Sequence, residues 1–122
     1  MKILIIDDDR AILQTLLERL SRWGYHALTA ENATEALTLL STQHVDLILL
    51  DVYLKDITAI ELIPKLKGIN PIAGIITMTG QSSRQLELKI RSFGILYYME
   101  KPIETDNFKL ILEHINKRIN NQ

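Results

Sequence analysis

Apolar residues follow two patterns along this chain: short continuous runs, and longer stretches with apolar positions three or four residues apart. Continuous runs of five to seven residues are typical of strands buried on both faces of a parallel sheet. Such runs cover Lys2–Ile6, Tyr25–Ala30, Val45–Leu50, Ile72–Met78 and Ile95–Met99. The pattern therefore predicts five buried strands.

Each run is followed by a stretch with helical spacing, which predicts an amphipathic helix after every strand. The apolar positions of these helices lie within Ile12–Leu20, Ala33–Leu40, Ala59–Leu66, Leu86–Phe93 and Phe108–Ile119. Asn32 is a suitable N-cap for the second helix, and Gly24, Gly68 and Gly94 are expected to end the first, third and fourth. Five strand–helix units joined by short links predict an α/β fold, a doubly wound parallel sheet forming a single domain over residues 1–122. Right-handed crossovers then place helices on both faces of the sheet.

Composition narrows the class of protein. The chain has 122 residues, of which 47% are hydrophobic and 24% charged, as in a globular rather than a disordered protein. The formal net charge of −1 gives no reason to expect binding to nucleic acid or to an anionic membrane. The absence of cysteine excludes disulfides and thiolate metal sites. No apolar run is long enough for a membrane span, and Met1 leads directly into a strand without a signal-peptide layout, so we expect a cytoplasmic location.

Polar residues with distinctive chemistry stand at the ends of the predicted strands. Asp7 and Asp8 follow the first strand, Asp51 the third, Thr79 the fourth and Lys101 the fifth. Ligands of open parallel sheets bind outside the carboxyl ends of the strands, so these groups are expected to converge. Clustered carboxylates resist ionisation unless a cation neutralises them, and Mg²⁺ prefers oxygen ligands. The sequence therefore predicts a site for a divalent cation and a phosphoryl group.

A simpler interpretation of the acidic run is a solvated cap at the start of the first helix. Asp9 fits that role as an N-cap. For Asp7 and Asp8 the simpler interpretation is weakened because Asp51, Thr79 and Lys101 stand at the other strand ends.

With the motifs Asp7-Asp8, Asp51, Thr79-Gly80 and Lys101-Pro102 in this order, the chain resembles the receiver domain of bacterial two-component response regulators. The resemblance covers essentially the whole chain. It implies a flavodoxin-like sheet of five strands in the order 2-1-3-4-5, with five helices. It also implies a Mg²⁺ or Mn²⁺ ion held directly by Asp8 and Asp51, by Asp7 largely through water, and by the backbone carbonyl of Tyr53.

The resemblance further assigns the covalent chemistry. Asp51 would be the nucleophile that forms an aspartyl phosphate, with Lys101 and Thr79 stabilising the phosphoryl group. The peptide bond between Lys101 and Pro102 would be cis and would aim the lysine inward. Tyr98 matches the aromatic switch position, with Tyr97 on the opposite face of the strand. Tyr53 and Gln81 flank the pocket by family position.

Two features depart from the family pattern. The loop after Asp51 has Lys55, Asp56, Thr58 and Ala59 where the family usually has Pro, Gly, Asp and Gly. Glycine permits backbone conformations that other residues adopt less easily, so the replacements put the path of the loop, and the Tyr53 carbonyl, in question. Pro64 falls inside the third helical pattern, which predicts either a kink or a late start with Pro64 in the first turn.

The resemblance implies a phosphoacceptor signalling module rather than a turnover enzyme. Its partners would be a sensor histidine kinase or a phosphotransfer protein, and a second copy could dock on the face of the fourth helix, fifth strand and fifth helix. A metal-dependent phosphohydrolase with an aspartyl nucleophile is an alternative, because Asp7 and Asp9 have its Asp-x-Asp spacing. A degenerate receiver that folds without accepting phosphate is a third alternative, motivated by the altered loop.

Overall fold

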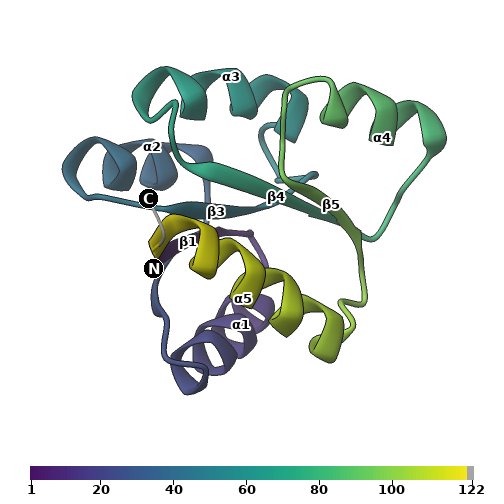
Figure 1. Ribbon diagram of the computed structural model, residues 1–122. Coiled ribbons are helices and arrows are strands. Elements are labelled where there is room, and N and C mark those ends of the chain that lie inside the picture. The colour runs from purple at the N-terminus through teal and green to yellow at the C-terminus, as the bar shows by residue number, and fades with distance from the viewer. Residues whose placement is uncertain (121–122) are drawn as a thin grey trace.

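The computed structural model describes residues 1–120, which form a five-stranded parallel sheet with five helices (Figure 1). The strands lie in the order β2-β1-β3-β4-β5, so the predicted α/β fold, its topology and its flavodoxin-like strand order are confirmed. The strands are β1 (Lys2–Ile6), β2 (His26–Ala30), β3 (Leu47–Asp51), β4 (Gly74–Thr79) and β5 (Tyr97–Glu100). The helices are α1 (Arg10–Arg22), α2 (Ala33–Thr42), α3 (Ala59–Ile69), α4 (Arg84–Arg91) and α5 (Thr105–Asn120).

Strands β3, β4 and β5 each begin two residues later than their apolar runs and extend one residue beyond them. The largest discrepancy is at Ile72, whose side chain is 92% exposed and is therefore not part of a buried strand. The side chain of Asn70 accepts hydrogen bonds from the backbone N–H groups of Ile72 and Ala73, which holds this segment in a turn. Hydrophobicity alone thus placed the start of β4 wrongly.

Helix boundaries follow capping side chains. Asn32 caps α2 as predicted, by accepting a hydrogen bond from the backbone of Glu35. Gly94 follows α4 with a φ of 76°, the left-handed conformation that suits glycine after a helix. Gly68, by contrast, lies inside α3, so the prediction that it ends the helix is wrong. Helix α4 ends at Arg91, short of the predicted Phe93.

Pro64 lies inside α3, which already begins at Ala59. The predicted late start of this helix is therefore wrong. Proline has no backbone N–H, so one carbonyl in the preceding turn of α3 lacks its helical hydrogen-bond donor. Pro64 lies on the exposed face of the helix, where water can reach that carbonyl.

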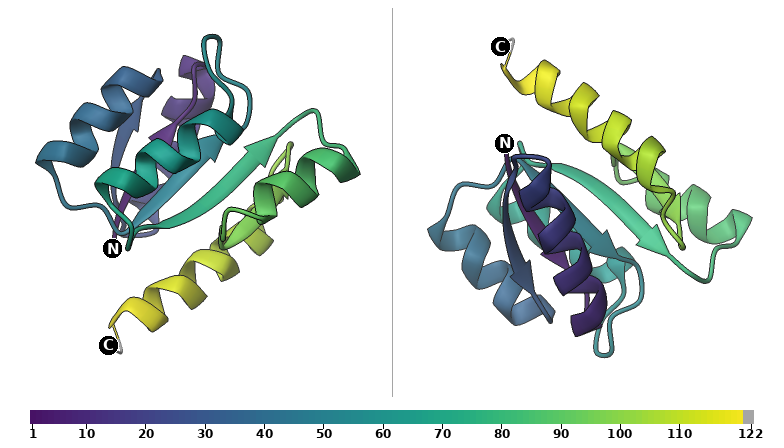
Figure 2. Two further views of the ribbon diagram at one scale, coloured as in Figure 1. Left: turned by 90° about the horizontal axis from the view of Figure 1, so that it is seen from above. Right: turned by 90° about the horizontal axis from the view of Figure 1, so that it is seen from below.

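Helices cover both faces of the sheet (Figures 1 and 2). Helices α1 and α5 pack on one face, where Leu16, Leu20 and Phe108 are buried with Ile3 and Leu49. Helices α2, α3 and α4 pack on the other. Every residue of β3 is buried, as expected for a central parallel strand covered on both sides. The strand ends at which the site forms are thus held by a rigid core.

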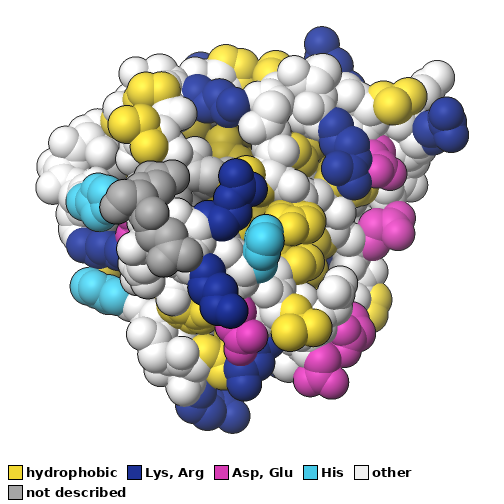
Figure 3. Space-filling view, viewed as in Figure 1, with side chains coloured by type: hydrophobic (Ala, Val, Ile, Leu, Met, Phe, Trp, Pro, Cys, Tyr) yellow, Lys and Arg dark blue, Asp and Glu magenta, His cyan; other side chains and the backbone are white. Residues whose placement is uncertain are grey.

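The surface carries charges of both signs. On the face drawn in Figure 3, basic and acidic side chains are interspersed with hydrophobic and uncharged ones, in line with the formal net charge of −1. Within residues 1–120, no helix is both long and apolar enough to span a membrane.

Candidate phosphoacceptor site

Strands β1 and β3 are neighbours in the sheet, and both end in carboxylates. Ile6 pairs in register with Leu50, so Asp7 and Asp51, the next residue on each strand, emerge side by side. Asp7 is 1% exposed and its backbone N–H donates to the carbonyl of Ala30 on β2. Asp51 is 8% exposed. The fold therefore holds two buried carboxylates together at the carboxyl end of the sheet.

Asp8 completes an acidic cluster. Asp7, Asp8 and Asp51 each offer one carboxylate oxygen, and these oxygens lie within 4.8 Å of one another. Three hard oxygen donors at this spacing, two of them buried, suit a divalent cation such as Mg²⁺. Asp9 lies outside the cluster and caps α1, accepting hydrogen bonds from the backbone of Ala11 at 2.9 Å and Ile12 at 3.3 Å, as predicted.

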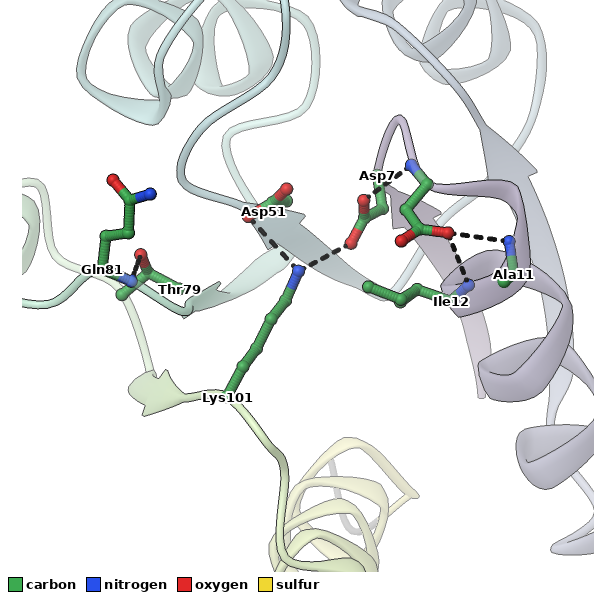
Figure 4. Close-up of polar contacts among 8 residues, drawn as sticks. Asp7, Ala11, Ile12, Asp51, Thr79, Gln81 and Lys101 are labelled. Atoms are coloured by element: carbon green, nitrogen blue, oxygen red, sulfur yellow. Dashed lines mark hydrogen bonds and ion pairs between the residues drawn. The ribbon is translucent and has the colours of Figure 1, made fainter.

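Lys101 reaches into the cluster from the end of β5 (Figure 4). Its Nζ donates to Asp7 Oδ2 at 3.0 Å and lies 3.5 Å from Asp51 Oδ1. The peptide bond between Lys101 and Pro102 is cis, as the resemblance implied. Three ionised carboxylates and one ammonium leave two negative charges, which is the charge that a divalent cation neutralises.

The acid–base properties of the cluster reflect its burial. Desolvation, reinforced by the charge of Asp7, raises the pKa of Asp51 to about 6, although Lys101 and the backbone N–H of Tyr53 oppose the shift. Burial alone would lower the pKa of Lys101, but its hydrogen bond to Asp7 and the charges of Asp51 and Asp7 raise it instead. Lys101 is therefore held as a cation beside a carboxylate that gives up its proton with difficulty.

Thr79 is the last residue of β4 and is 1% exposed. Its hydroxyl accepts a hydrogen bond from the backbone N–H of Gln81 at 3.0 Å, and its carbonyl accepts one from the backbone N–H of Lys101 at 2.8 Å. Figure 4 shows Thr79 and Asp51 on neighbouring strand ends, with Lys101 between Asp51 and Asp7. Thr79 thus borders the site without a direct hydrogen bond to the carboxylates.

The altered loop after Asp51 is held by its own backbone. Ala59 N–H donates to the carbonyl of Val52 at 2.8 Å, and Tyr53 and Thr58 form an antiparallel bridge. Among residues 1–120, no residue other than glycine has a positive φ, so Asp56 and Ala59 are compatible with this path. The backbone N–H of Tyr53 favours the ionised form of Asp51 and so opposes the rise of its pKa.

The two adjacent tyrosines of β5 face opposite sides of the sheet, as predicted. Tyr97 packs with the α1–α5 core and Tyr98 with the α2–α3–α4 core. The hydroxyl of Tyr98 forms a 2.8 Å hydrogen bond with the hydroxyl of Ser82 in the loop between β4 and α4. Sequence reasoning missed Ser82, because a serine in a polar loop carries no pattern that reveals its partner.

Comparison with known proteins identifies the family that this fold and site define. Residues 3–113 match the model of the response regulator receiver domain, and the chain belongs to that family. It is 32% identical over 111 residues to the transcriptional regulatory protein ZraR of Escherichia coli strain K12, an alignment that covers 91% of this chain and 25% of ZraR. The chain thus spans about a quarter of the length of the curated relatives it matches.

Solved structures give the same result. A two-component response regulator from Clostridium difficile superposes with a TM-score of 0.93 at 29% identity, covering 98% of both chains. A response regulator from Burkholderia pseudomallei superposes with a TM-score of 0.82 at 30% identity, covering 88% of this chain and 63% of the other. That structure contains a phosphorylated aspartic acid and a calcium ion.

Proposed function

We propose that this chain accepts a phosphoryl group on Asp51 in the presence of Mg²⁺ or Mn²⁺ and thereby switches the conformation of a two-component signalling protein. The observation that carries the proposal is the convergence of Asp7, Asp8, Asp51 and Lys101 at one end of the sheet. Family membership supports it, as does the phosphorylated aspartic acid of the similar Burkholderia pseudomallei protein.

Each residue has a distinct task in the transfer. A carboxylate oxygen of Asp51 attacks the phosphorus of the donor, the bond between phosphorus and donor breaks, and its electron pair leaves with the donor. Phosphoryl transfer depends mainly on positioning and charge stabilisation, and the Lys101 ammonium lies close enough to contact a phosphoryl oxygen on Asp51. Thr79 supplies a hydroxyl donor at the edge of the site.

Asp8 and Asp51 would hold the cation directly, Asp7 largely through water, and the carbonyl of Tyr53 would complete the protein ligands. When bound, the cation neutralises the carboxylates and the transferring phosphoryl oxygens. The hydrogen bond from Lys101 to Asp7 already occupies one oxygen of Asp7, which agrees with an indirect role for this residue.

The donor would be a sensor histidine kinase or a phosphotransfer protein in the cytoplasm. The response would appear on the face formed by α4, β5 and α5, where an output segment, another partner or a second copy of the chain would dock. Leu88 on α4 is 59% exposed and Leu110 on α5 is 63% exposed, which gives this face apolar contact points among its charges. The chain would act once on its own aspartate, catalysing its phosphorylation and dephosphorylation, and not as a turnover enzyme.

Incubation with acetyl phosphate and Mg²⁺, followed by intact-mass measurement, tests the proposal. A long-lived adduct of one phosphoryl group supports it. Many turnovers of a small phosphate ester without an adduct would favour a phosphohydrolase instead. Neither adduct nor turnover would indicate a degenerate receiver.

A further inference from the structure

The loop between β3 and α3 is a tight hairpin whose tip carries two exposed charged residues, Lys55 and Asp56. Across the tip, the backbone N–H of Leu54 donates to the carbonyl of Ile57 at 3.1 Å, and the side chain of Leu54 is buried in the core of the α2–α3–α4 face. Figure 2 shows the hairpin projecting beyond the carboxyl end of the sheet. The backbone and one buried side chain therefore fix the position of this tip.

The tip forms one wall of a polar cup beside the acidic cluster. The cup has a volume of about 440 Å³ and is lined by Asp8, Arg10, Glu31, Asn32, Lys55 and Asp56. Asp8 also belongs to the acidic cluster, so the cup adjoins the candidate metal site. A water molecule takes up about 30 Å³ in the liquid, so the cup has room for several waters around a cation held at Asp8.

The carboxylates that line the cup differ in their partners. Glu31 is engaged by Arg10, whose Nε lies 2.6 Å from Glu31 Oε1. No ion pair within residues 1–120 involves Asp56 or its neighbour Lys55. Among the cup residues outside the acidic cluster, Asp56 is thus the carboxylate whose charge is left for a ligand.

We propose that Asp56 is a positioning residue for the divalent cation, and that its carboxylate accepts hydrogen bonds from waters that the cation retains in the cup. This inference rests on the proposed function, because it concerns the same metal site. Mg²⁺ loses its waters reluctantly and usually keeps several of them in a protein site. Hydrogen bonds to an ionised carboxylate are stronger than those to a neutral acceptor, so Asp56 is suited to hold these waters.

The position of Asp56 makes this contact a property of the present chain. Asp56 stands in the altered loop, where the family usually has glycine, which has no side chain to offer. Groups that hydrogen-bond to the inner ligands of a metal typically contribute tenfold or more to its affinity. The altered loop would therefore strengthen metal binding.

The test measures Mg²⁺ and Ca²⁺ binding by amide-shift titration of wild type, Asp56→Ala and Asp56→Glu, without a phosphodonor. In Asp56→Ala the affinity for Mg²⁺ should fall about tenfold. The affinity for Ca²⁺ should fall less, because Ca²⁺ has a more flexible geometry and takes more of its ligands from the protein. Asp56→Glu keeps a carboxylate and should recover most of the Mg²⁺ affinity.

Two control variants separate this contact from other effects of the substitution. Asp106→Ala removes an exposed carboxylate from the first turn of α5, at the same end of the sheet, and so reports the effect of net charge alone. Lys55→Ala alters the other residue of the hairpin tip and should not weaken Mg²⁺ binding.

A loss of Mg²⁺ affinity in Asp56→Ala no larger than in Asp106→Ala would overturn the inference, as would an equal loss in Lys55→Ala. Equal losses for Mg²⁺ and Ca²⁺ would also overturn it, because a contact through retained waters favours the ion that keeps them. Each of these results leaves the proposed function standing. A wild-type protein in which neither ion shifts the signals of Asp8 and Asp51 would overturn the metal site of the proposed function, and this inference with it.

Discussion

The ammonium group of Lys101 makes its shorter contact, 3.0 Å, with Asp7 and not with the candidate nucleophile. Lys101 therefore acts as an internal counter-ion for the acidic cluster, in addition to its proposed contact with the phosphoryl group. A divalent cation entering the cluster would share these carboxylates with the ammonium, so we expect metal binding and the position of Lys101 to be coupled.

Replacing Lys101 by Ala should separate these two roles. Without the ammonium the carboxylates lose their internal counter-ion, and Mg²⁺ affinity should rise about tenfold. Phosphorylation by acetyl phosphate should slow about a hundredfold, because one source of charge stabilisation is gone. Isothermal titration and intact-mass time courses measure the two effects. Lys65→Ala, which replaces an exposed lysine on α3, is the control and should leave the phosphorylation rate unchanged. An unchanged rate in Lys101→Ala as well would contradict the proposed role of Lys101.

Stability of the metal-free protein should fall as the pH rises through the range in which Asp51 ionises. The folded state raises the pKa of Asp51 from 3.8 to about 6, so the folded protein retains this proton where the unfolded chain has lost it. The contribution of this retained proton to the free energy of unfolding is complete below about pH 4 and is lost by about pH 7. It amounts to about 3 kcal/mol.

Asp51→Asn cannot ionise, so it should lack this part of the pH dependence and be more stable than wild type at pH 8. Urea unfolding of both proteins at pH 5 and pH 8, with EDTA present, gives the comparison. The same change in unfolding free energy in both proteins would show that burial of Asp51 carries no ionisation penalty.

Asp8→Ala should weaken binding of Mg²⁺ or Mn²⁺ by tenfold or more, because it removes a proposed direct ligand. Asp9→Ala is the matched control: it should cost about 1 kcal/mol of stability through loss of the α1 cap, and leave metal affinity unchanged. Amide shift titrations are the suitable measurement. Fluorescence of Trp23 would report poorly on the site, because Trp23 follows the far end of α1 and packs against Phe108 of α5. Unchanged affinity in Asp8→Ala would place the metal elsewhere.

Thr79→Ala should bind beryllofluoride at Asp51 but fail to pass the response to Tyr98 and α4. The variant lacks the hydroxyl that bonds to Gln81 and that would donate to the phosphoryl group. A ligand shifts a conformational equilibrium only through contacts that differ between the two states. Thr79→Ser keeps the hydroxyl and should behave as wild type. If α4 responds equally in all three proteins, Thr79 does not carry the signal.

The fold and the composition of the site follow closely from sequence. Continuous apolar runs identify β1 and β3 because both strands are buried on both faces, and the polar residues at their ends must then meet where the strands are adjacent. Ile72 was misplaced because its environment depends on a turn held by Asn70, which hydrophobicity does not encode.

Pairings between side chains were harder to predict than positions. The hydrogen bond between Lys101 and Asp7 joins residues 94 positions apart. That the ammonium lies closer to Asp7 than to Asp51 depends on the geometry of three strand ends. The bond between Ser82 and Tyr98 depends on the path of a short loop, for which the sequence has no periodic signal.

Localisation of the phosphoryl group tests the central claim most directly. Wild type and Asp51→Asn are incubated with acetyl phosphate and Mg²⁺, and the modified residue is mapped by tandem mass spectrometry. We predict one phosphoryl group on Asp51 in wild type and none in Asp51→Asn, because an amide is not the required nucleophile. Phosphorylation that persists in Asp51→Asn would contradict the assignment and place the acceptor on another residue.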